Sequence, residues 1–251
     1  MKTQNQQLLN KVPELTLIFW IIKILGTTVG ETAADFLAFN LHFGLNQTAL
    51  LMSILLLIIL YFQFKKDRYV PALYWTTVVL ISIVGTLITD ALVENVGVPL
   101  NVTTIIFSSL LILTFILWKK NEKTLSVHSI FSLKRERYYW VTILFTFALG
   151  TSAGDLIGED LKLGYLLSAI LFLTIILLIV LAYYLLKLNA ILTFWMAYIL
   201  TRPLGASLGD LLTQPHKYGG LGFSSFSISV IFFIAIILLV INLTKKESLK
   251  N

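Results

Sequence analysis

Cysteine is absent from the 251 residues, and charged side chains make up only 13% of them. The lack of cysteine excludes disulfides and thiolate metal sites. A soluble domain of this size carries about 25% charged residues, so the shortage of charge excludes an ordinary soluble fold. The sequence also lacks a nucleotide-binding motif. Residues 1–13 are polar and the first apolar segment is long and followed by others, so we expect no cleaved signal peptide.

Long apolar segments take the place of the missing charge. Hydrophobic residues make up 57% of the chain, and its mean hydropathy is +0.88. Several apolar runs approach the roughly 20 residues that a membrane helix needs. We therefore predict an all-α, polytopic membrane protein, whose first helix begins at Pro13 and Glu14. The eight predicted spans are about 14–39, 47–64, 71–95, 100–118, 138–160, 164–186, 190–213 and 222–243.

The basic residues outside the spans are distributed unequally between the two sides. The loops on one side carry only Lys162 and Lys217. The other side carries fifteen: Lys2, Lys11, Lys65, Lys66, Arg68, Lys119, Lys120, Lys123, Lys134, Arg135, Arg137, Lys187, Lys245, Lys246 and Lys250. This asymmetry predicts that both termini lie in the cytoplasm. It also explains the net charge of +6 without a nucleic-acid partner.

A sparse motif recurs four times: a tryptophan, a glycine ten residues later and an aspartate five residues after that. The copies are Trp20/Gly30/Asp35, Trp75/Gly85/Asp90, Trp140/Gly150/Asp155 and Trp195/Gly205/Asp210. They predict four parallel two-helix repeats, at about 14–64, 71–118, 138–186 and 190–243, within one transmembrane domain covering 1–251. A basic cytoplasmic loop, 119–137, separates the two halves.

A different register is also possible. It shifts the alignment by one turn and matches Gly26-Thr27 and Gly30-Glu31 to Gly150-Thr151 and Gly154-Asp155. We prefer the tryptophan register, in which the four tryptophans anchor the cytoplasmic interface as an aromatic belt.

Acidic residues gather near one end of the odd-numbered helices. Three pairs are spaced four residues apart and so share a helix face: Glu31/Asp35, Asp90/Glu94 and Asp155/Glu159, with Asp210/Gln214 as a partial fourth. Ionisable residues inside a span are costly and are functional candidates by default. We expect Glu31, Asp35, Asp90, Asp155 and Asp210 to bind a cation or metal, with Glu94 and Glu159 nearer the mouth. The alternative is that the acids are interface residues facing water, which suits Asp160 best.

Two cations lie within the same helices. Lys23 and Arg202 each precede an acid of their own helix by eight residues. Lys23 could extend its amine to the cytoplasmic interface or serve as an internal counter-charge. Arg202 lies deeper, and we expect it to pair with an acid of a neighbouring repeat. An anion-binding role is the alternative for Arg202, since guanidinium also suits carboxylate or phosphate.

Glycine, alanine, serine and threonine crowd the stretches before these acids, for example Gly150, Thr151, Ser152, Ala153 and Gly154. Small residues allow membrane helices to approach closely. We therefore expect the four odd-numbered helices to form an inner ring around the acids. The even-numbered helices are almost wholly apolar, and we expect them to face lipid.

The four repeats, each with its tryptophan, glycine and aspartate, resemble a bacterial membrane-protein family known only as a repeat of unknown function. The resemblance covers about 14–243, and the characteristic tryptophans would be Trp20, Trp75, Trp140 and Trp195. It implies four tandem repeats of two spans each in a bacterial inner membrane, and it implies no activity. The second and fourth repeats depart from the acid pattern, since Thr86 replaces the acid seen at Glu31 and Gln214 replaces a second acid.

Three classes of function are consistent with these features. The first is a secondary transporter or exporter of a cation, in which hard oxygen ligands favour a divalent metal such as Mn²⁺ or Mg²⁺, exchanged for protons. The second is an intramembrane aspartyl hydrolase, although the segments around Asp155 and Asp210 lack the Gly-x-Gly-Asp arrangement of that group. The third is a receptor or scaffold that transports nothing. We favour the first, with the cation as substrate, the lipid bilayer as surroundings and no cofactor. The ion, the direction of transport and the oligomeric state are left open.

Overall fold

Eight long helices account for most of the computed structural model, which describes residues 10–248. Lys2 and Lys250 of the orientation argument lie outside this range. The helices are α2 (Leu17–Asp35), α3 (Leu45–Phe64), α4 (Pro71–Asp90), α5 (Leu100–Glu122), α6 (Leu133–Asp155), α7 (Tyr165–Leu186), α8 (Ala190–Thr213) and α9 (Ser225–Ser248). All eight are long and apolar enough to cross a membrane. The chain is therefore a multi-pass, all-α membrane protein, as predicted.

Several predicted boundaries are wrong, including that of the last span, which was predicted at 222–243 and is Ser225–Ser248. Helix α2 begins at Leu17 rather than at Pro13, because the Thr16 hydroxyl accepts a hydrogen bond from the Phe19 amide and so caps the first turn. The loop predicted at 119–137 is shorter, because α5 continues to Glu122 and α6 already begins at Leu133. The Ser132 hydroxyl caps that second start.

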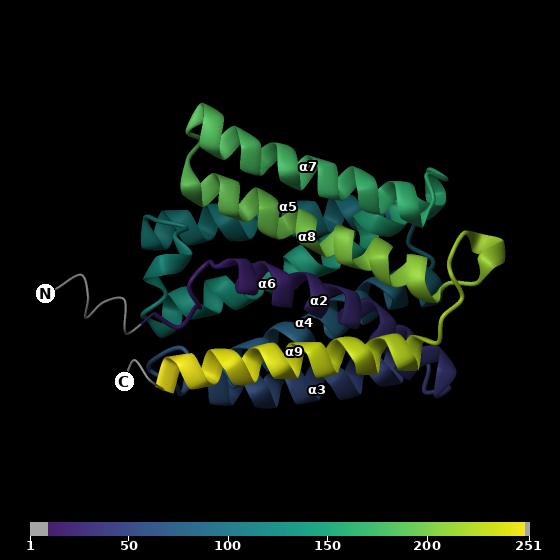
Figure 1. Cartoon of the computed structure of the whole chain (residues 1–251), viewed down its shortest axis with the longest axis horizontal. Helices are drawn as coiled ribbons and strands as arrows, with labels where there is room; N and C mark the ends of the chain where they lie inside the picture. Colours follow the sequence, from purple (N-terminus) through teal and green to yellow (C-terminus); the bar gives the residue numbers. More distant parts are fainter. Residues whose placement is uncertain (1–9, 249–251) are drawn as a thin grey trace, which may run out of the picture.

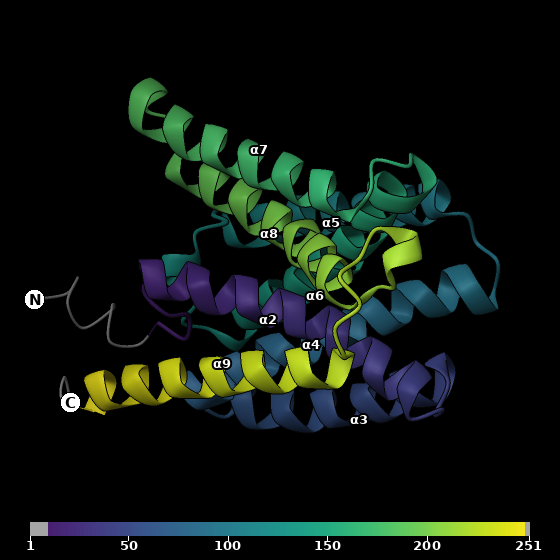
Figure 2. The same cartoon turned by 45° about the vertical axis from the view of Figure 1, so that its right-hand side comes forward.

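The helices form two concentric layers (Figures 1 and 2). Helices α2, α4, α6 and α8 pack in that order, and α8 packs back on α2 to close an inner ring. Outside them, α3 packs on α4, α5 on α6, α7 on α8 and α9 on α2. Each outer helix thus covers the inner helix of the next repeat. In their most apolar stretches 56–67% of inner-ring residues are buried, against 11–28% in the outer helices. The prediction that the even-numbered spans, here α3, α5, α7 and α9, form an outer layer is confirmed.

The glycine of each repeat marks a close contact in this ring. A Cβ atom added there would meet the side chain seven residues past the tryptophan of the next repeat. The contacts are Gly30 with Ser82, Gly85 with Phe147, Gly150 with Arg202, and Gly205 with Thr27. The last contact returns from the fourth repeat to the first. One small residue at the same place in every repeat therefore forms the same helix–helix contact around the whole ring.

We expect Gly205→Ala to destabilise the ring. The added carbon would lie 2.0 Å from Thr27 Oγ1 and 3.0 Å from the Thr28 amide nitrogen, so rotating one side chain does not clear it. Overpacking of this kind costs about 1–3 kcal/mol. The matched control is Gly26→Ala, whose new carbon would be 3.6 Å from Val79, an ordinary contact. Thermal unfolding in detergent measures both variants. Equal midpoints for the two would contradict the close contact.

The N-terminal segment crosses one end of the bundle. Helix α2 begins and helix α9 ends at this end in Figure 1, and we name it the terminal end. The Lys11 amide donates to the Ile130 carbonyl, and the Lys11 amine lies 2.7 Å from the Glu136 carboxylate. That carboxylate also accepts a hydrogen bond from Gln63 at 3.0 Å. Both members of the ion pair are buried, so the segment is held to α3 and α6 by polar contacts inside the protein.

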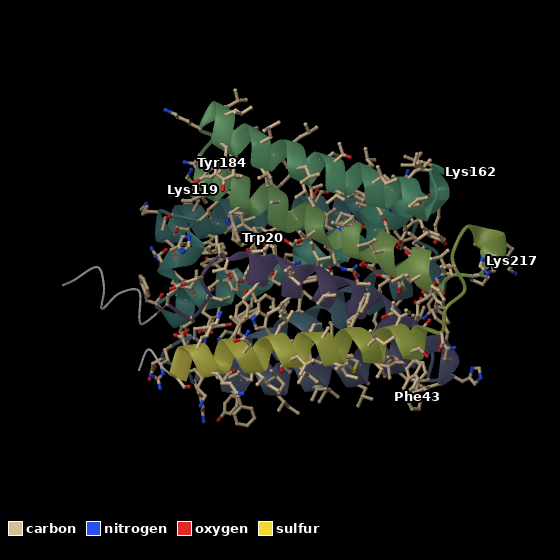
Figure 3. The ribbon with its side chains drawn as sticks, in the orientation of Figure 1. Trp20, Phe43, Lys119, Lys162, Tyr184 and Lys217 are labelled. Atoms are coloured by element: carbon tan, nitrogen blue, oxygen red, sulfur yellow. The ribbon has the colours of Figure 1, made fainter. Side chains whose placement is uncertain are left out.

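The loops at opposite ends differ in charge, as the orientation argument requires. Figure 3 shows Lys119 near the terminal end and Lys162 and Lys217 at the other. The aspartates of the repeats are nearer the second end, because they close α2, α4 and α6 or lie in the last turn of α8. We name it the acidic end.

Candidate functional site

Side chains on the inner face of the ring form layers along its axis. We number positions from the tryptophan of each repeat. Residues at −1, +3, +7, +11 and +15 follow one i, i+4 ridge on each inner helix, with successive layers about 6 Å apart. Each layer is named after its most characteristic side chain. The aromatic layer, at −1, is Phe19, Tyr74, Tyr139 and Phe194, and the lysine layer, at +3, is Lys23, Val78, Ile143 and Tyr198. The arginine layer, at +7, is Thr27, Ser82, Phe147 and Arg202; the threonine layer, at +11, is Glu31, Thr86, Thr151 and Ala206; the aspartate layer, at +15, is Asp35, Asp90, Asp155 and Asp210.

The aromatic layer closes the terminal half of the ring. All four of its residues are buried, and the Tyr74 and Tyr139 hydroxyls lie 2.5 Å apart. The neighbouring tryptophans take part in the closure. Trp75, Trp140 and Trp195 are buried, and Trp195 stacks edge-on against Trp118. The prediction that the tryptophans form an interfacial belt is therefore wrong for these three, because they fill the space between helices.

Lys23 lies inside the ring and does not reach the surface. Its side chain is fully buried, and its amine sits 4.1 Å from the Phe147 ring and 4.2 Å from the Tyr198 ring. Phe147 is on α6, across the ring from α2, so the amine points to the axis. Among the described residues it has no hydrogen-bond partner. Cation–π contacts of this kind are its stabilising interactions, which rules out extension to the interface in this conformation.

Arg202 connects all four inner helices. Its Nη2 lies 2.8 Å from Glu31 on α2 and 2.7 Å from the Thr151 hydroxyl on α6, and it also donates to the Thr86 hydroxyl on α4. The three partners occupy the same position, +11, in the first three repeats. The expected pairing of Arg202 with an acid of a neighbouring repeat is confirmed. Arg202 is fully buried and Glu31 is 5% exposed, so this ion pair is shielded from solvent.

The four aspartates form the next layer toward the acidic end. Asp210 is buried, and Asp35, Asp90 and Asp155 are half-buried. Glu31 is close enough to interact electrostatically with all four. The five predicted binding acids therefore converge at one end of one axis. Arg202 and Lys23 lie behind them and offset only part of this charge.

Glu94 and Glu159 lie farther out, at the mouth of the ring. Both are exposed, and Glu159 accepts a hydrogen bond of 2.9 Å from Tyr165. They sit in π-helical turns, η2 (Ala91–Asn95) and η4 (Leu156–Asp160), and a third such turn, η1 (Phe36–Asn40), follows Asp35. Each turn begins directly after the aspartate of its repeat. π-helical turns are frequent at functional sites, and here they widen the helices where the acids begin.

The acids are not arranged as a ready-made metal site. Within residues 10–248, no three histidine, aspartate or glutamate side chains are close enough together to hold one metal ion. The aspartate layer thus supplies concentrated negative charge from separate carboxylates.

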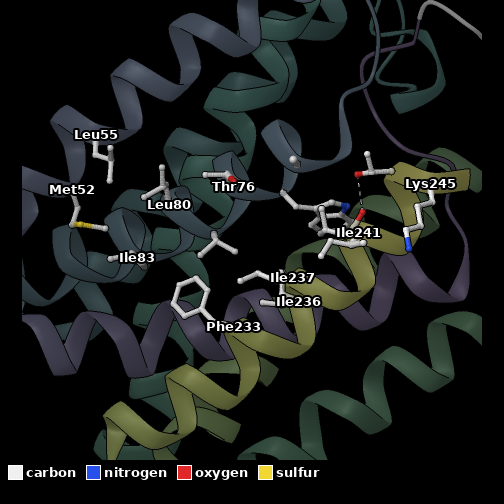
Figure 4. A pocket seen from close by; sticks show the side chains of 15 residues that line it. Met52, Leu55, Thr76, Leu80, Ile83, Phe233, Ile236, Ile237, Ile241 and Lys245 are labelled. Atoms are coloured by element: carbon white, nitrogen blue, oxygen red, sulfur yellow. Dashed lines mark hydrogen bonds between the residues drawn. The ribbon is translucent and has the colours of Figure 1, made fainter. Parts of the chain in front are cut away.

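A pocket of about 470 Å³ lies beside the mouth, lined by Glu159, Lys162, Tyr165, Gln214 and Tyr218 among others. A larger groove of about 710 Å³ lies between α3, α4 and α9, well away from the acids (Figure 4). Its lining is mostly leucine, isoleucine, valine and aromatic side chains from the outer surface of the ring. We therefore assign this groove to the lipid-facing surface and place the site on the axis.

Comparison with known families decides the repeat register. A family model, Repeat of Unknown Function (DUF347), matches residues 18–69, 73–124, 138–189 and 193–248. The chain belongs to this family. Every DUF347 match begins two residues before the tryptophan of its repeat, which confirms the tryptophan register over the one-turn shift. Among the curated proteins and solved structures compared with the chain, none matches.

Several axial residues of the DUF347 repeats are not among the predicted site residues. They are Thr86, Thr151, Phe147 and Tyr198. Aligning the four repeats on their tryptophans identifies these residues. Position +11 reads Glu, Thr, Thr, Ala, and position +7 reads Thr, Ser, Phe, Arg. A column that is polar in three of four repeats, inside an apolar span, indicates a position facing the axis.

Proposed function

We propose that the protein is a secondary transporter of a cation, with the axis of the inner ring as its path. The observation that supports this most is the aspartate layer. Four carboxylates and Glu31 converge at one end of a ring that is closed behind them by the arginine, lysine and aromatic layers. Like charges gathered in a low dielectric favour the binding of a cation or of protons. Neither a scaffold nor a receptor needs this arrangement.

The cargo we propose is a divalent metal such as Mn²⁺ or Mg²⁺, with protons as the exchanged ion. Carboxylates are hard ligands and suit these metals. Mg²⁺ keeps several waters and is held through one or two carboxylates. A partly hydrated ion therefore suits a layer in which no three acids meet at one point. The remaining carboxylates would neutralise the charge through water and carry the exchanged protons.

The access side follows from the orientation of the helices. Basic loops lie at the terminal end and few basic residues lie at the acidic end, so we place the termini in the cytoplasm of a bacterial cell. The aspartate layer then faces outward, and the aromatic layer is the cytoplasmic closure. Transport requires this closure to open.

The direct test is flux in proteoliposomes. With a metal-sensitive dye and a pH-sensitive dye inside, we expect saturable Mn²⁺ or Mg²⁺ movement coupled to an opposite proton movement. Protein-free liposomes are the control. Folded protein that moves none of a panel of divalent and monovalent cations would end the proposal.

Labelling tests the orientation separately. Lys123 and Lys217 are both exposed and lie at opposite ends of the bundle. Because the chain has no cysteine, Lys123→Cys and Lys217→Cys each introduce a single thiol. In intact cells we expect an impermeant maleimide to label only Lys217→Cys. Labelling of both, or of Lys123→Cys alone, would contradict the assigned orientation.

A further inference from the structure

One nitrogen of Arg202 is enclosed by oxygen atoms from three helices. Glu31 Oε2 lies 2.8 Å from Nη2, Thr151 Oγ1 lies 2.7 Å from it, and Thr86 Oγ1 is also in hydrogen-bond contact. The three oxygens come from equivalent positions of three repeats, so the pseudo-symmetry of the ring brings them to one point on the axis. All three residues are buried. Three converging oxygens of this kind can hold a cation of any type, of which the guanidinium nitrogen is one.

The rest of the guanidinium group lacks comparable partners. Nε and Nη1 of Arg202 are fully buried and, within the described part of the chain, form no hydrogen bond. Arginine that serves a purely structural carboxylate usually binds it through two parallel hydrogen bonds. Here one nitrogen makes every contact. The oxygen cluster therefore fits a single atom on the axis better than it fits a guanidinium group.

We propose that the threonine layer is an inner site for a monovalent alkali-metal cation, and that Arg202 Nη2 occupies this site in the conformation described. The cluster holds one carboxylate and two neutral hydroxyls, so a single positive charge balances it. With its single carboxylate, the site is thus distinct in charge from the aspartate layer. Its role as a coupling site rests on the proposed transport function.

Displacement of Arg202 links this inner site to the aspartate layer. A cation that enters the cluster takes the place of Nη2, and the guanidinium must move. Arg202 already interacts electrostatically with Asp90 and Asp155, so these acids are its nearest alternative partners. A guanidinium there competes with the divalent cargo. Binding at the two sites is therefore antagonistic, and each cation weakens the binding of the other to the same degree.

The test removes the competing cation. Arg202→Met keeps a long apolar side chain and leaves the Glu31 carboxylate without its partner. We expect purified Arg202→Met to gain thermal stability in sodium or potassium chloride relative to choline chloride of equal ionic strength. At a concentration about 100-fold above Kd, the midpoint should rise by about 5 °C. The wild type should show a smaller dependence, because an alkali cation must first displace its own arginine.

Two further variants locate the effect. Glu31→Gln with Arg202→Met removes the charge of the site and should abolish the salt-specific stabilisation. Thr151→Val with Arg202→Met removes one hydroxyl and should weaken apparent affinity about tenfold. The inner site would be overturned if sodium and potassium chloride do not raise the thermal midpoint of Arg202→Met, or if choline chloride raises it equally. It would also be overturned if the rise persists after Glu31→Gln is added. If Arg202→Met folds only in sodium or potassium salts the site is supported, and if it folds in none the site is rejected.

The outcomes separate this site from the transport proposal. Alkali-specific stabilisation of Arg202→Met without any flux through the wild type would keep the inner site and end the transport function. Divalent flux through the wild type, with an Arg202→Met variant indifferent to sodium and potassium, would keep the transport function and end the inner site.

Discussion

Replacing Asp35 or Asp155 by asparagine is expected to reduce metal flux to that of protein-free liposomes. Both side chains belong to the aspartate layer and interact electrostatically with Glu31. Asparagine keeps the volume of aspartate and removes its charge, so the layer attracts a divalent cation less and carries one fewer exchangeable proton. Folding should be preserved, because the change relieves repulsion between like charges. Flux and elution from a size-exclusion column measure the two effects.

The control for this pair is Asp160→Asn. Asp160 is exposed and falls outside the axial layers, so the same chemical change should leave flux close to that of the wild type. Glu94→Gln, at the exposed mouth, should give an intermediate loss. Wild-type flux in both Asp35→Asn and Asp155→Asn would exclude the aspartate layer from transport.

A second large effect is expected at the opposite end of the bundle. Lys11→Met leaves the Glu136 carboxylate, which is 1% exposed, without its cation. Removing one partner of a buried ion pair costs about 3–5 kcal/mol, because the other charge stays buried and uncompensated. We expect a lower thermal midpoint and easier proteolysis of the N-terminal segment. Adding Glu136→Gln should restore most of the stability, since the amide keeps a hydrogen-bonding group beside Gln63.

Lys134→Met is the matched control for Lys11→Met. Lys134 also pairs with a glutamate, Glu122, at 3.2 Å, but its side chain is 59% exposed. Exposed ion pairs contribute little, so its midpoint should stay near that of the wild type. If Lys11→Met and Lys134→Met unfold alike, the Lys11–Glu136 pair does not hold the terminal end together.

Much of the architecture could be predicted because membrane insertion restricts the chain so strongly. Apolar length gives the spans, the basic loops separate into two groups, and the tryptophan register aligns the repeats. The convergence of the acids could also be expected, since charges inside spans avoid lipid. Each of these features is a property of a single helix or of an alignment of the repeats, and the sequence contains both kinds of information.

Contacts between repeats could not be predicted in the same way. The seating of Ser82 on Gly30, or of Thr27 on Gly205, depends on the order and closure of the ring, which no single helix specifies. Tryptophan suits an interface and a packed core equally well, so the burial of Trp75 and Trp140 follows only from their neighbours. Lys23 is similar. Its distance from the helix end permitted an interfacial amine, and only Phe147 and Tyr198, from other repeats, show that it points inward.

The asymmetry on the axis is possible only because the four repeats are joined in one polypeptide. Helix α9 packs on α2 as α3 packs on α4, so a ring of four separate two-helix subunits would close in the same way. Identical subunits, however, would place either four arginines or none in the arginine layer, and either four glutamates or none in the threonine layer. Covalent linkage lets one gene assign a different chemical task to each quarter of the ring. A single guanidinium facing a single carboxylate therefore requires four repeats that differ in sequence, which a ring of identical subunits cannot supply.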